Sequence, residues 1–198
     1  RGTCDFDPGV GTYTIASAGG DDVFVSKLNS SGNFVWAKSF GAASLDVANA
    51  IYTDASGNVF TTGAFRNTVD FDPGAGSYSL TSFGSADVFI QKMDPAGNFL
   101  WAGQMGGTQD DYGMGMYVDA AGIVYTTGYF NATSDFDPTA GMLNLTSAGQ
   151  TDAFVQRMCQ VTSQPGTISG ATSLCGNGTQ TYSISAVSGA TSYSWSLP

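Results

Sequence analysis

The sequence predicts an all-β chain built from 65-residue repeats, and three observations support this fold class. The segment Asp-Phe-Asp-Pro begins at Asp5, at Asp70 and again at Asp135, each time 65 residues after the last copy. All 16 acidic residues are aspartate, and the chain has 27 glycines but no glutamate and no histidine. Short runs of aromatic and β-branched residues alternate with glycine-containing turns, a composition that favours strands over helices.

Each repeat carries four strand patterns joined by two short turns. In the first repeat the runs rich in aromatic and β-branched residues are 23–28, 34–40, 49–54 and 58–65. The links 29–33 and 54–58 each place a glycine where a short hairpin needs a positive φ, and the second repeat keeps this chemistry at 94–98 and 119–122. Four antiparallel strands arranged as a meander are what a β-propeller blade requires.

The remaining stretch of the repeat, residues 68–87, is expected to cross from one blade to the next. It carries an Asp-Phe-Asp-Pro segment and one further short β pattern at 77–82. The repeat pattern stops near Cys159, so residues 1–160 are assigned to repeats starting at 5, 70 and 135, and residues 161–198 to a separate domain. Two or three blades form an incomplete ring, since propellers have roughly four to eight blades. We therefore expect either further blades before Arg1 or an open array of repeats with capping elements.

Two parts of the chain resemble known families. The run DVFIQKMDPAGNFLW from Asp87, followed by Gly106-Gly107, Asp111 and the run VDAAGIVYTTG from Val118, resembles the bacterial β-propeller repeat called the seven-bladed or SBBP repeat. The segment from Pro165 to Trp195 resembles the opening of a PKD-like, immunoglobulin-type β-sandwich domain, common in exported proteins of Bacteroidetes-type bacteria. The resemblance implies a secreted or cell-surface protein, for which type IX secretion is typical, and supplies no agreed catalytic residues.

Paired aspartates in the repeated segment are the candidate metal ligands. Asp5 and Asp7, Asp70 and Asp72, and Asp135 and Asp137 each lie two residues apart, so both carboxylates of a pair can face one centre in a bent loop. Carboxylate oxygens are the ligands that Ca²⁺ prefers, which makes calcium the candidate cofactor. In the alternative interpretation, the first aspartate caps a turn through its own backbone and the phenylalanine packs inward.

Three further groups of residues recur or stand out. Asp22, Asp87 and Asp152, together with Asp46 and Asp111, precede strands and are expected to accept hydrogen bonds from backbone amides between blades. Trp36 and Trp101 would stack on a sugar if exposed, but their place in apolar strands favours burial between blades. Cys4 and Cys159 interrupt the repeat pattern, and we hypothesise a link between them.

The composition excludes several classes of function. A net charge of −10 with only six scattered Lys and Arg residues speaks against nucleic-acid binding. No apolar run is long enough to span a bilayer, so membrane insertion is not expected. Without His or Glu the chain lacks the usual general bases, and it is not expected to be an enzyme.

The sequence therefore predicts a non-catalytic extracellular scaffold for binding or adhesion, whose partner is a surface glycan or a protein ligand of unknown identity. Two alternatives remain. The chain is a structural stalk or packing module of a larger secreted enzyme, or it is a passenger that engages the type IX export machinery.

Overall fold

The computed structural model describes residues 2–139 and 141–158, and the chain divides into two compact units, residues 1–158 and 159–198. The described residues form antiparallel strands and no helix, which confirms the all-β prediction, and they accordingly contain no helix that could cross a membrane. The strands are β1 (Thr3–Asp5), β2 (Thr14–Ala16), β3 (Val23–Leu28), β4 (Phe34–Phe40), β5 (Val47–Thr53), β6 (Val59–Asp70), β7 (Ser79–Met93), β8 (Phe99–Gly107), β9 (Tyr112–Val118), β10 (Val124–Asp135) and β11 (Asn144–Met158).

The strands recur with the period of the sequence. The starts of β4 and β8, of β5 and β9, of β6 and β10, and of β7 and β11 are each 65 residues apart. The predicted hairpin turns are confirmed, because four glycines at equivalent places have a φ of about 80°, a conformation that side chains with a Cβ rarely adopt. They are Gly32 (80°), Gly57 (79°), Gly97 (81°) and Gly122 (80°).

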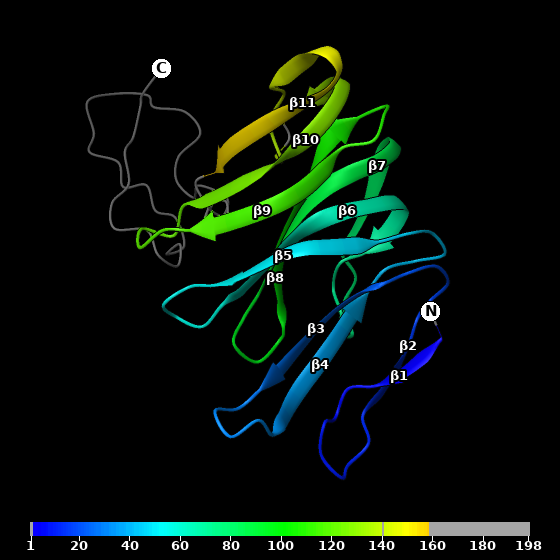
Figure 1. The fold of residues 1–198 in the computed structure, drawn as a ribbon, viewed down its shortest axis with the longest axis vertical. Helices are drawn as coiled ribbons and strands as arrows, with labels where there is room; N and C mark the ends of the chain where they lie inside the picture. The colour runs from blue at the N-terminus through cyan, green and yellow to red at the C-terminus, as the bar shows by residue number, and fades with distance from the viewer. Residues whose placement is uncertain (1, 140, 159–198) are drawn as a thin grey trace, which may run out of the picture. The chain divides into compact units, whose positions relative to one another are not determined.

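A four-stranded meander in the order β5-β6-β7-β8 forms one part of a seven-stranded sheet (Figure 1). Two residue pairs, Ser134 with Gly107 and Asp135 with Gly106, join its strand β8 to β10. The first two strands of the meander belong to one sequence repeat and the last two to the next. The prediction that the four strands of a single repeat form one meander is therefore wrong. β3 and β4 pair as a separate hairpin, so the strand pairing is interrupted between β4 and β5. β9 and β11 pair with β10 on its two sides.

Residues 68–87 do not cross between blades as predicted, but extend the hairpin of β6 and β7. Pairing runs from Val59 with Met93 to Arg66 with Ala86, and resumes from Thr68 with Thr81 to Asp70 with Ser79. At the interruption Asn67 has a φ of 62° and residues 82–85 bulge outward. β10 and β11 repeat this register, with Ala132 at the same place. The crossings between meanders are instead the short connections 41–46 and 108–111.

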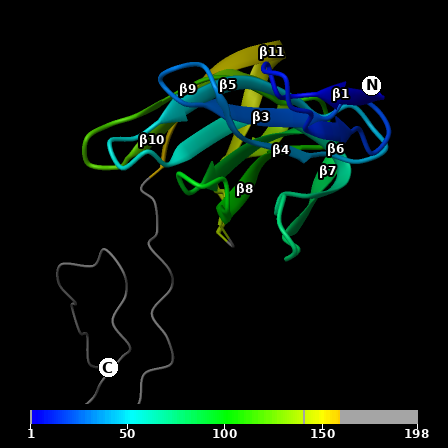
Figure 2. The same ribbon diagram turned by 90° about the horizontal axis from the view of Figure 1, so that it is seen from below.

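The central meander buries both of its faces. Successive residues of β7 point to opposite sides, so that Phe89 joins Phe40, Phe65 and Phe71 on one face, while Val88 and Ile90 join one cluster with residues of β9–β11 on the other. Figures 1 and 2 show the β3–β4 hairpin next to β5, and Phe40 at the end of β4 contacts the rings of Phe71 and Phe89. A blade of this kind is covered only when it has a neighbour on each side.

The tip of the β6–β7 hairpin supplies part of this core. Phe71, the phenylalanine of the second Asp-Phe-Asp-Pro segment, is 0% exposed and contacts the rings of Phe40, Phe65 and Phe89. Its carbonyl oxygen accepts a hydrogen bond of 2.6 Å from the buried amide of Gln91. The tip is therefore folded back into the molecule instead of projecting as a free loop.

We expect Phe71→Ala to lower the free energy of unfolding by about 3–5 kcal/mol, the usual cost of emptying a buried aromatic site. Phe83→Ala is the matched control, because Phe83 is 58% exposed and its truncation should change stability by about 0.5 kcal/mol or less. Urea unfolding of both variants measures the difference. Equal losses would show that the hairpin tip is not anchored by Phe71.

Candidate functional site

The first aspartate of each Asp-Phe-Asp-Pro segment closes the hairpin tip. The same carboxylate oxygen, Oδ1, accepts two backbone N–H groups, one from the residue two positions later and one from the residue eight positions later. The distances are 3.0 and 2.8 Å at Asp5, at Asp70 and at Asp135 alike. At Asp5 these bonds, that from Tyr13 first, lower the pKa of the carboxyl because they favour its charged form.

The second aspartate of each segment makes a smaller turn. Its Oδ1 accepts the backbone N–H of the residue two positions later, at 2.8 Å for Asp7 and Asp72 and at 2.9 Å for Asp137. A Cβ on the glycine four positions later, such as Gly76 after Asp72, would lie 2.3 Å from the other oxygen, Oδ2. A side chain at this position would displace the carboxylate, and the segment has the geometry of the turn-forming interpretation.

The structure keeps the six candidate metal ligands in three separate hairpin tips. Each tip brings together two carboxylates, Asp5 with Asp7, Asp70 with Asp72, and Asp135 with Asp137. Across residues 2–139 and 141–158, no group of three or more His, Cys, Asp or Glu side chains could hold a metal ion. This geometry does not test calcium binding at the tips, and turn formation accounts for the contacts that it shows. The pairing of Cys4 with Cys159 stays a prediction, since Cys4 is exposed and Cys159 lies outside the described residues.

The recurring aspartates accept backbone amides, but only Asp46 and Asp111 link different meanders as predicted. Asp22, Asp87 and Asp152 instead accept the N–H group of the residue four positions earlier. Asp46 accepts the N–H groups of Ala42, at 2.8 Å, and of Arg66, at 3.0 Å, and so ties the end of β4 to β6. Asp111 does the same between Gly107, at 2.8 Å, and Asn131, at 2.9 Å, tying β8 to β10. Burial raises the pKa of both carboxyls and these bonds partly offset it. Both residues are buried and join successive meanders.

Trp36 is partly buried between repeats. Its indole Nε1–H donates to the carbonyl oxygen of Pro95 at 3.2 Å, and Lys27 donates to the same oxygen at 2.8 Å. The ring lies against Gly97, where a Cβ would come within 3.2 Å of it. Trp36 thus packs against a turn of the next repeat, as expected for a position between repeats.

A groove of about 470 Å³ lies between equivalent turns of two successive repeats. Tyr52 and Asp54 line one side and Tyr117 and Asp119 the other, and each residue stands 65 positions from its counterpart. The two rings meet edge to face with centroids 5.3 Å apart, and Tyr117 is 53% exposed. Asp54 and Asp119 are held by their own turns, since each Oδ1 accepts two backbone amides.

Sequence reasoning missed this groove. The available signal was the recurrence of tyrosine two positions before each Asp-Ala turn, at Tyr52 and at Tyr117. The groove is a recess with two aromatic rings and fixed carboxylates, and none of its lining residues is Lys or Arg. Such a surface suits a neutral or cationic ligand and disfavours a polyanion.

The comparisons agree with the repeated β structure. Residues 161–198 match the model of a PKD-like domain. The chain is 27% identical over 125 residues to an uncharacterized WD repeat-containing protein of Acanthamoeba polyphaga mimivirus, covering 55% of this chain and 9% of that protein. It is 25% identical over 155 residues to the regulatory protein FlaEY of Caulobacter vibrioides, covering 75% of this chain and 16% of that protein.

The WD-repeat relative is distant and indicates propeller-like repeats in this chain. The chain spans less than a fifth of the length of either curated relative.

We expect the melting midpoint of the protein to be the same in calcium and in excess chelator. The Oδ1 atoms of Asp70 and Asp72 already accept backbone N–H groups of their own turn, so the hydrogen bonds that form the turn do not need an ion. A thermal melt in both buffers measures this, because a ligand that binds only the folded state must raise the midpoint. A rise in calcium that Asp70→Asn abolishes would establish the tips as metal sites.

Proposed function

We propose that this chain is a non-catalytic binding scaffold of a secreted or cell-surface protein, and that the groove between Tyr52 and Tyr117 receives its ligand. The observation that carries the proposal is that two successive repeats place the same pair of side chains on opposite walls of one groove. A site assembled from equivalent residues arises again at every junction where both repeats keep them. This property is typical of binding arrays.

The chemistry of the groove favours a surface glycan without charged groups. Tyrosine rings offer flat apolar faces with a polar tip, and they contribute contact area at low cost in conformational entropy. The Asp54 and Asp119 carboxylates retain lone pairs that can accept hydroxyl hydrogens. Both carboxylates sit on hairpin turns fixed by backbone hydrogen bonds, and both rings sit on the strands that lead into these turns, so the site is preorganised.

The finer architecture in this proposal is a set of SBBP-type propeller blades followed by the opening of a PKD-like, immunoglobulin-type sandwich. The four-stranded meander, the distant WD-repeat relative and the PKD-like match at residues 161–198 support it. Extracellular placement, with export by the type IX route, rests on the resemblance of both parts to modules of exported bacterial proteins.

A second candidate function is a stalk or packing module of a larger secreted enzyme. It is favoured by the small share, 9% and 16%, of the curated relatives that this chain covers. In that case the chemistry belongs to another domain of the protein, because this chain has no His and no Glu. Export as a passenger of the type IX machinery is compatible with either function.

We expect the protein to bind at least one neutral polysaccharide in a saturable manner, and Tyr117→Ala to weaken that binding roughly three- to tenfold, since an aromatic contact contributes about 0.5–1.5 kcal/mol. A panel of immobilised glycans followed by titration calorimetry measures both. Leu100→Ala is the matched control, because Leu100 is 48% exposed but lies on β8, away from the groove. Absence of saturable binding, or equal affinities of the three proteins, contradicts the proposal.

A further inference from the structure

Two carboxylates of the second repeat are buried side by side where the β5–β8 meander meets strands β9–β11. Asp87 on β7 is 0% exposed, and Asp111, just before β9, is 1% exposed. A Cβ on Gly106 would lie 2.6 Å from Asp87 Oδ1 and 3.0 Å from Asp111 Oδ2, so both oxygens face the small space that this glycine leaves open. Two ionised carboxylates in such a place repel each other and have lost their hydration.

The two carboxylates differ in the hydrogen bonds that they accept. Asp111 receives three, from the N–H groups of Gly107 and Asn131 and from the Ser134 hydroxyl at 3.0 Å. Asp87 receives one, from the N–H of Phe83 at 2.8 Å, through Oδ2. Its other oxygen, Oδ1, is buried without a hydrogen-bond partner. Asp111 is therefore the better-stabilised anion, and Asp87 is the better site for a proton.

The neighbouring charges do not relieve this pair. Arg66 on β6 forms its ion pair with Asp110, at 2.9 Å, and also donates to Ser85. Burial raises the pKa of Asp111, and the charge of the adjacent Asp110 adds a smaller contribution in the same direction. Burial, with a smaller contribution from the charge of Asp111, raises the pKa of Asp87 to about 7. From β10 the pair is faced by Asn131 and Ser134, which do not ionise in this range.

We propose that Asp87 and Asp111 share one proton, held on Asp87 Oδ1, and that its loss to solvent weakens the junction between the β5–β8 meander and strands β9–β11. The proton makes Asp87 a neutral donor toward the ionised Asp111, which removes the repulsion and gives the unpartnered oxygen a role. This inference concerns regulation of the fold and does not depend on which ligand the protein binds.

Asp111 is well placed to transmit the change. Its backbone N–H donates to the carbonyl oxygen of Ala86 on β7 at 2.7 Å, and its side chain holds the end of β8 and the middle of β10. When Asp87 becomes charged, the repulsion acts on the residue that ties the β5–β8 meander to β10. Loosening at neutral pH and above therefore begins at this junction.

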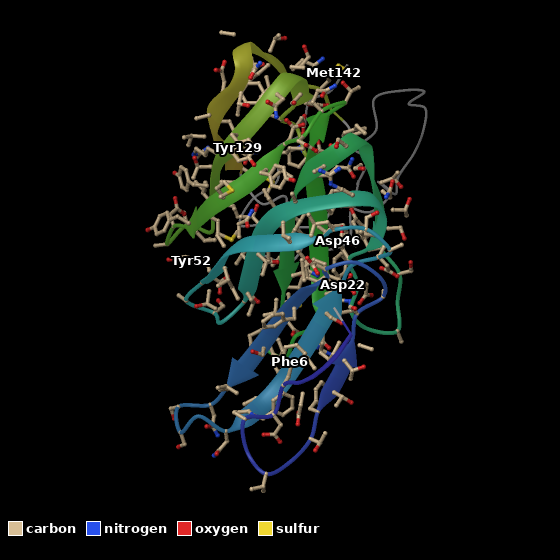
Figure 3. All side chains as sticks on the ribbon, turned by 45° about the vertical axis from the view of Figure 1, so that its right-hand side comes forward. Phe6, Asp22, Asp46, Tyr52, Tyr129 and Met142 are labelled. Atoms are coloured by element: carbon tan, nitrogen blue, oxygen red, sulfur yellow. The ribbon has the colours of Figure 1, made fainter. Side chains whose placement is uncertain are left out.

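The first repeat contains an internal comparison. Asp22 and Asp46 occupy the equivalent positions, a Cβ on Gly41 would lie 2.5 Å from Asp22 Oδ1, and this oxygen also has no hydrogen-bond partner. Both aspartates line a hollow of about 520 Å³ and lie near each other in Figure 3. As a residue Asp22 is half-buried, whereas Asp87 is 0% exposed. The proton-sharing state thus belongs to the enclosed copy.

The chain is well suited to a test, because it has no histidine and no glutamate. Ordinary aspartates titrate near pH 3.9, the α-amino group near 7.7–8.0 and thiols near 8.5, so a change centred between pH 5 and 7.5 points to a perturbed aspartate. A carboxyl whose pKa is raised in the folded state stabilises the fold below its unfolded pKa, and the benefit is lost as the pH rises through the folded pKa. Stability should fall from pH 5 to 7.5.

The experiment is urea unfolding of the full chain across this range. For the unmodified protein we expect the unfolding equilibrium constant to rise roughly ten- to hundredfold from pH 5 to 7.5. In Asp87→Asn the rise should disappear, because the amide stays neutral and can donate to Asp111. Asp22→Asn, the matched control in the open copy, should keep it. A flat profile in the unmodified protein, or an unchanged rise in Asp87→Asn, overturns the proposal.

A second measurement does not need the variants to fold. The infrared spectrum of the unmodified protein at pH 5.5 should show the C=O stretch of a protonated carboxylic acid, and this band should disappear by pH 8.5. Hydrogen exchange at the Gly107 and Asn131 amides, corrected for intrinsic rates, should quicken over the same interval. Absence of the acid band at pH 5.5 overturns the proposal.

Discussion

A meander with two apolar faces cannot be stable alone in water, and this constraint organises the rest of the structure. β7 sends Phe89 to one face and Val88 and Ile90 to the other, so the sheet needs a neighbour on both sides. The hairpin tips fold inward to fill the space between neighbours, as Phe71 and Phe136 do. Connections between meanders are consequently short and run close to the core.

Aspartate side chains accept the backbone N–H groups that this packing leaves near the core, a role that suits the only acidic residue type in the chain. Short crossings leave backbone N–H groups near the core, and buried donors must find acceptors. A side chain with one methylene reaches amides two, four or eight positions away, as Asp72, Asp46 and Asp70 illustrate in different roles. The longer glutamate side chain would carry its carboxylate past these amides. The acidic composition thus serves local backbone bonding as well as charge.

Most of the fold could be predicted from the sequence because the turns carry their own chemistry. The glycines at 32, 57, 97 and 122 and the alternating runs between them mark strands that the structure confirms. The pairing of β6 with β7 could not be predicted, since it depends on which face of each strand finds an apolar partner. The groove at Tyr52 and the enclosed pair at Asp87 were missed for a similar reason, because the repeat pattern shows equivalence but not proximity.

The long hairpin of β6 and β7 also bears on how such a chain lengthens. Because the central meander takes two strands from each of two repeats, a duplicated 65-residue segment inserted into it would supply strands that find equivalent partners on both sides. Tandem duplication therefore adds a complete meander wherever the breakpoints fall. Strands of successive repeats also pair within one meander, so a repeat cannot detach without breaking the hydrogen bonds that its neighbour makes. Lengthening by duplication and resistance to separation both follow from the offset between the sequence repeat and the meander.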